Sequence, residues 1–164
     1  MFTKIIDFLT EWESESASTL KIFQNLTDQS LAQTVYPGGR TLGRLANHII
    51  ETLTEMPHKL GLGIEESSAD FHSVTELIAE YKKHAESLAF AIKEKWTDAN
   101  LDATTNMYGE EWKNGFSLWV LITHQIHHRA QMTVLMRQAG LKVPGVYGPS
   151  KAEWAGYGAP PPEV

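Results

Sequence analysis

The sequence contains no cysteine among its 164 residues. This absence excludes disulfide bonds, thiolate zinc sites and a cysteine nucleophile. Any bound metal must therefore be held by histidine, aspartate or glutamate side chains. Any reactive sulfur must arrive with a ligand.

The chain also lacks a long apolar run and a concentration of positive charge. No apolar stretch reaches the roughly 18 residues of a membrane-spanning helix, and acidic residues appear too early in MFTKIIDFLTEWESE for a secretory signal. Lys and Arg number 14 against 20 Asp and Glu, a formal net charge of −6, and no basic cluster forms a phosphate-binding track. We expect a cytoplasmic protein that binds neither membranes nor nucleic acid.

The composition is that of a globular protein, with 42% hydrophobic and 21% charged residues. A chain of 164 residues is long enough to bury one continuous core, and nothing in the sequence indicates a second domain. We expect a single domain over residues 1–164.

Apolar residues spaced by three and four predict four long helices. A Pro/Gly-rich tail, about 141–164, is expected to be irregular, and residues 97–114 to form a long connection with room for a short turn or hairpin. The predicted fold is therefore all-α, an up-down four-helix bundle with an irregular tail. The helices are expected from Phe2 to about Leu26, from Thr41 as N-cap to Pro57, which should end or kink the helix, from a Ser73–Glu76 capping box to Trp96, and from just after Gly115 to Gly140.

The last of these helices carries two histidines four residues apart, His124 and His128, in an apolar segment. Residues with this spacing lie on the same helix face. Burying two neutral imidazoles without partners is costly, whereas a shared divalent ion satisfies both. His48, in TLGRLANHIIETL, is the other histidine in a comparable setting. Three imidazoles and one open position are typical of catalytic zinc sites, although such a pair can also simply hydrogen-bond at a core edge.

Other polar residues accompany these histidines. Gln125 stands where a zincin motif needs glutamate, so that metalloprotease class fits poorly. Glu51, Gln131 and Asn47 are candidates to orient a ligand or a bound water, although Glu51 also fits an ordinary solvent-facing position. Arg129 points away from the histidine face and is expected to be a surface or interface charge.

The fourth helix is apolar on nearly every side, because Trp119, Ile122 and Ile126 lie away from His124. A helix of this kind is buried on both sides, within its own bundle or against a second subunit. We therefore expect a homodimer that forms through this helix or its neighbours.

The segment THQIHHRAQ at Thr123–Gln131 resembles the His-x-x-x-His-Arg-Gly-Gln signature of the DinB-like (damage-inducible) family of metal-binding four-helix bundles. TLGRLANHI at Thr41–Ile49 resembles the second-helix motif of that family, and VPGVYGPSKAEW is similar to its tails. The resemblance covers nearly the whole chain. One departure is Ala130, where the family usually has glycine.

The resemblance implies an up-down-down-up or related bundle, a homodimer, and a zinc, nickel or similar divalent ion on His48, His124 and His128. Family members of known activity are metal-dependent transferases of low-molecular-weight thiols such as bacillithiol, mycothiol or glutathione. We expect a metal-activated thiolate to attack an electrophile, the small-molecule substrate. Two alternatives stay open: a hydrolase that uses metal-bound water, and a non-catalytic dimer that binds a metal and a small molecule.

Overall fold

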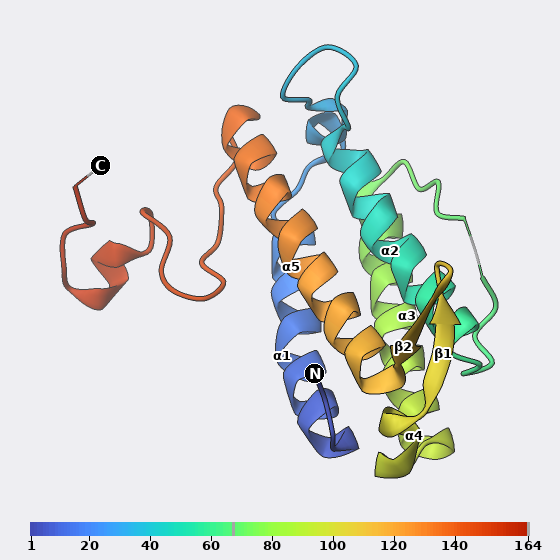
Figure 1. The fold of residues 1–164 in the computed structure, drawn as a ribbon. Helices are drawn as coiled ribbons and strands as arrows, with labels where there is room; N and C mark the ends of the chain where they lie inside the picture. The colour runs from blue at the N-terminus through green and yellow to red at the C-terminus, as the bar shows by residue number, and fades with distance from the viewer. Residues whose placement is uncertain (67, 164) are drawn as a thin grey trace.

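Four long helices form the body of the protein: α1 (Ile5–Phe23), α2 (Leu42–Lys59), α3 (Val74–Lys95) and α5 (Asn114–Gln138). The structure is a computed structural model, and it describes residues 1–66 and 68–163. The helices pack side by side as a bundle (Figure 1), which confirms the predicted all-α fold.

The order of the helices in the bundle is up-down-down-up. Both α1 and α2 pack against α3 and α5, so α1 and α2 lie diagonally across the core. α1 and α5 start at the same end, where the Phe2 backbone N–H donates to the Gly115 carbonyl at 3.1 Å. α2 and α3 start at the opposite end, where the Asn47 side chain exchanges hydrogen bonds of 3.0 and 2.8 Å with the Phe71 backbone. The long connection between α2 and α3 returns the chain to that end (Figure 1).

Local sequence signals set the helix ends. Thr41 Oγ1 accepts a hydrogen bond of 3.0 Å from the Arg44 backbone N–H at the start of α2, and the predicted capping box starts α3. Gly140 has φ +74°, the left-handed conformation of a residue that follows a helix. Pro57 does not end α2, which continues to Lys59.

The connections contain shorter elements. A 3₁₀ helix, η1 (Asp28–Ala32), lies between α1 and α2, and a short helix, α4 (Asp98–Asp102), follows α3. The strands β1 (Thr104–Met107) and β2 (Glu110–Lys113) then pair antiparallel as a hairpin. The tail contains η2 (Trp154–Tyr157) and extends away from the bundle (Figure 1).

The core lies between the four long helices and includes side chains with no exposed surface, such as Phe8, Leu53 and Leu121. Across residues 1–66 and 68–163, no helix combines the length and apolarity that a membrane span requires.

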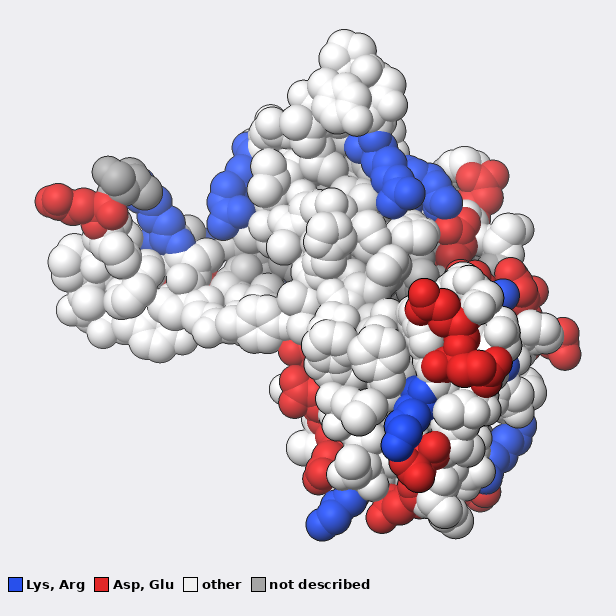
Figure 2. Space-filling view, viewed as in Figure 1, with Lys and Arg blue, Asp and Glu red and all other residues white. Residues whose placement is uncertain are grey.

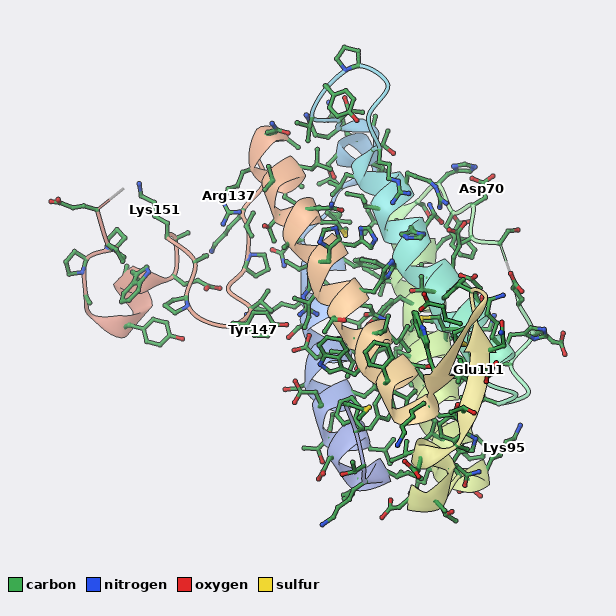
Figure 3. The ribbon with its side chains drawn as sticks, in the orientation of Figure 1. Asp70, Lys95, Glu111, Arg137, Tyr147 and Lys151 are labelled. Carbon is green, nitrogen blue, oxygen red and sulfur yellow. The ribbon has the colours of Figure 1, made fainter. Side chains whose placement is uncertain are left out.

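A buried ion pair joins α1 to α5 and corrects one sequence-based expectation. Glu15 and Arg129 are only 4% and 2% exposed, although Arg129 was expected to be a surface or interface charge. The Arg129 guanidinium donates to the Glu15 carboxylate and, at 3.0 Å, to Thr19 Oγ1. Tyr147 reaches the same carboxylate from the tail (Figure 3), its hydroxyl donating to Oε1 at 2.9 Å. The Glu15 carboxylate and Thr19 Oγ1 accept hydrogen bonds from Arg129. These bonds offset the free energy that is lost when α1 and the tail remove the guanidinium from water.

Candidate metal centre

Two neighbouring helices bring three histidines together. His48 projects from α2, and His124 and His128 project from α5. The ring centroids lie 5.0 Å apart for His48 and His124, 4.7 Å for His48 and His128, and 4.4 Å for His124 and His128. Each ring offers one nitrogen, and these nitrogens all lie within 4.8 Å of one another. We call this cluster the histidine triad.

The two rings from α5 have the spacing of ligands that share an ion. Their Nε2 atoms lie 3.1 Å apart. Two nitrogens bound to one zinc at about 2.0–2.1 Å in tetrahedral geometry are about 3.3 Å apart. One proton can bridge only two of the three rings, whereas a cation can accept a lone pair from each. The donor set therefore fits a divalent ion such as zinc.

Hydrogen bonds orient two of the rings from outside the triad. His128 Nδ1 lies 2.7 Å from the Gln131 side-chain oxygen, which can only accept, so Nδ1 carries the hydrogen and Nε2 keeps a lone pair directed at the triad. His48 Nδ1 lies 3.4 Å from Glu51 Oε2. That carboxylate oxygen also accepts a hydrogen bond of 2.8 Å from Arg44. Glu51 and Gln131 thus stand behind the rings in the manner of residues that fix ligand orientation.

Burial keeps the α5 imidazoles neutral. Desolvation, together with the smaller effects of the nearby His128, His48, His127 and Arg40, lowers the pKa of His124 to about 4. Desolvation also lowers the pKa of His128, against the opposing effect of its hydrogen bond to Gln131. Neutral imidazole is the form that binds metals.

A cavity of about 500 Å³ opens beside the triad and includes His128 in its wall. Its other walls come from the 35–40 loop, from Leu45 of α2 and from the C-terminal half of α5. We call this hollow the entry cavity. It gives a small molecule access to the side of His128, so an ion on the triad would lie next to a space of ligand size.

Some residues do not occupy the places that the sequence suggested. The Asn47 side chain bonds the Phe71 backbone and so anchors a loop instead of orienting a ligand. Arg129 lies on the far side of α5 from the triad, with Glu15. Sequence reasoning did not find the residues of the 35–40 loop, because a loop has no periodic pattern to indicate which side chains face a cavity.

Comparison with known proteins places this geometry in context. The sequence model of the DinB family matches residues 1–163. A curated relative, the uncharacterized protein YrdA of Bacillus subtilis (strain 168), is 41% identical over the full length of both chains. A DinB-like protein from Bacillus cereus ATCC 10987, known from a crystal structure, is 41% identical with a TM-score of 0.85, over 90% of this chain and 100% of that one. A second, YjoA from Bacillus subtilis, shares the fold at 14% identity, with a TM-score of 0.70 over 88% and 99% of the two chains.

Proposed function

Because this chain belongs to the DinB family, we propose that His48, His124 and His128 hold a divalent metal ion, zinc or nickel, and that the protein transfers a low-molecular-weight thiol to an electrophile. The observation that carries this proposal is the convergence of three imidazole nitrogens within 4.8 Å, beside a cavity that a small molecule can enter. The absence of cysteine fits a reaction whose sulfur arrives with the cosubstrate.

The residues around the triad favour a thiol over water as the nucleophile. A divalent cation bound at such a site would lower the pKa of a coordinating thiol. The thiol would then lose its proton without a separate base. Within residues 1–66 and 68–163, no carboxylate lines the entry cavity, and Glu51, which lies behind His48, is already paired with Arg44. Hydrolysis usually needs a positioned general base. Gln131 and Glu51 instead hold the imidazoles in the tautomer that leaves the inward nitrogens free.

Two measurements test the proposal. Elemental analysis of untagged protein should find about one equivalent of metal per chain, and less in His124→Ala. A panel of thiols with monochlorobimane, run beside ester and amide substrates, should show conjugation above the buffer blank that is lost on chelation. Conjugation no faster than the blank with metal bound would overturn thiol transfer. Ester or amide cleavage under those conditions would point to the hydrolase instead.

A non-catalytic role has its own signature. In that case chelation would lower the melting temperature strongly, while no thiol, ester or amide substrate would turn over. The metal would then act only by stabilising the contact between α2 and α5.

We further propose that the protein is a homodimer that pairs through the first half of α5 and the hairpin. Rings from the hairpin and α5 form a continuous series, with centroid distances of 5.9, 5.2 and 5.7 Å through Tyr108, Trp112, Phe116 and Trp119. Tyr108 and Trp119 are 56% and 42% exposed. Figure 2 shows a broad surface free of Lys, Arg, Asp and Glu over α5. The hairpin itself carries the exposed charges of Glu110, Glu111 and Lys113, so the uncharged part of the proposed interface lies on α5. Exposed aromatic surface without charge is typical of interfaces. Sedimentation as a monomer at micromolar concentration would overturn this proposal.

A further inference from the structure

One guanidinium at the entry cavity has no partner. Arg40 is exposed, lines the cavity, and forms no hydrogen bond or ion pair with any described residue. Two other arginines do have acidic partners, since Arg44 pairs with Glu51 and Arg129 pairs with Glu15. In a chain with a net charge of −6, an arginine without an acidic partner at a cavity is available for a ligand.

The backbone on both sides of Arg40 is well defined. The Gly39 N–H donates to the Tyr36 carbonyl at 2.9 Å across a turn with Pro37 at its second position. Gly38 at the third position has φ +81°, as a type II turn requires. Thr41, directly after Arg40, caps α2. A closed turn and a helix start therefore hold the Arg40 backbone at the cavity rim.

The rest of the cavity wall is mostly apolar. Val35, Tyr36 and Val134 are 58%, 65% and 51% exposed, which is unusual for three apolar side chains around one cavity. Among the described residues, no acidic side chain lines the cavity, and Arg40 is the one permanent charge of its wall. The field of Arg40 reaches His124 and His128.

We propose that the entry cavity is a binding site for a small carboxylate with an apolar body, and that Arg40 binds the carboxylate. The apolar body lies along Val35, Tyr36 and Val134, and the far end of the ligand reaches the triad. The identification of that far end as a thiol rests on the function proposed above. The carboxylate subsite is argued independently of that function. Guanidinium matches a carboxylate in a bidentate arrangement that lysine cannot reproduce.

The test uses matched acids and amides. Straight-chain ω-mercaptocarboxylates with two to five methylenes are titrated calorimetrically into zinc-loaded full-length protein, beside the corresponding ω-mercaptoamides. Hexanoate and hexanamide form a thiol-free pair. The variants are Arg40→Gln and Arg40→Lys, with Arg137→Gln as a control because Arg137 is exposed on α5 but does not line the cavity. Zinc content is measured for each variant.

The best-fitting acid should bind about tenfold more tightly than its amide to the wild type and to Arg137→Gln. Arg40→Gln should abolish this preference for the acid, and Arg40→Lys should keep only part of it. The zinc content of both variants should equal that of the wild type. Equal binding of acid and amide, or a preference that survives Arg40→Gln, would overturn the proposal and leave thiol transfer standing. A hexanoate preference that depends on Arg40, with no added affinity from the thiol group, would support the carboxylate site while removing thiol binding.

Discussion

Arg129 directly follows His128 in the chain, yet their side chains lie on opposite sides of α5. The His128 ring joins the triad beside α2, whereas the Arg129 guanidinium is buried against Glu15 of α1. Two adjacent residues thus fix the rotation of α5 relative to both of its neighbours. The stability of the bundle and the geometry of the triad are linked through this one helix.

The Glu15–Arg129 pair should be essential for stability. Glu15→Gln leaves a buried guanidinium without its counter-charge, which costs about 3–5 kcal/mol in comparable buried pairs. We expect a loss of that size in the free energy of unfolding, measured by urea denaturation followed by circular dichroism. The control is Glu13→Gln, since Glu13 is exposed on the same helix. A loss no larger than that of the control would mean that the pair contributes little.

Gln131 should matter for metal affinity without being a ligand. Gln131→Ala removes the acceptor 2.7 Å from His128 Nδ1, and loss of such an outer hydrogen bond typically lowers metal affinity by about 10–100-fold. Competition with a chromophoric chelator measures this change. Gln138→Ala is the matched control, because Gln138 is an exposed glutamine near the end of α5. Unchanged affinity in Gln131→Ala would show that the ring does not depend on this contact.

The metal-free protein should lose stability in acid. Folding lowers the pKa of His124 from 6.5 to about 4, so between these values the unfolded chain binds more protons than the folded one. The contribution of His124 to the free energy of unfolding should therefore be complete above about pH 6.5 and should decrease as pH falls towards 4. Urea titrations with chelator present, at pH 5 and pH 7.5, measure the difference. His124→Ala should reduce it, and His72→Ala, at an exposed side chain, should not.

Trp119→Glu should separate the proposed dimer. The indole is 42% exposed in the isolated chain, and a carboxylate in its place would be desolvated without a partner at an interface. Sedimentation velocity should show monomers for this variant at concentrations where the wild type is dimeric, with an unchanged circular dichroism spectrum. Lys151→Glu introduces a glutamate at an exposed position in the tail, outside the proposed interface, and should stay dimeric. A dimeric Trp119→Glu would place the interface elsewhere.

Local patterns in the sequence predicted most of the fold. Apolar spacing and capping residues act over a few residues, so the four long helices and the starts at Thr41 and Ser73 could be found without tertiary information. The short strands could not, because Met107 is their one fully buried side chain and four residues give no clear alternation. Pro57 shows the same limit, since α2 tolerates it two residues before its end.

The candidate site divides in a similar way. His124 and His128 follow from spacing within one helix, and His48 from its apolar surroundings, while their convergence depended on how α2 packs against α5. The pairing of Glu15 with Arg129 joins residues far apart in sequence, so helix periodicity could not reveal it. Arg40 lies in a loop, and its place at the entry cavity exists only once that loop packs near α5.

The turn at Tyr36–Gly39 has a consequence for how this chain can diversify. The loop that carries Arg40 begins after η1 and ends at the cap of α2, outside the helical residues that supply the imidazoles. In the proposed site, substitutions there would change which molecules bind while the triad and the core packing stay intact. Selection, or an engineer, could therefore alter the proposed ligand preference separately from the histidines.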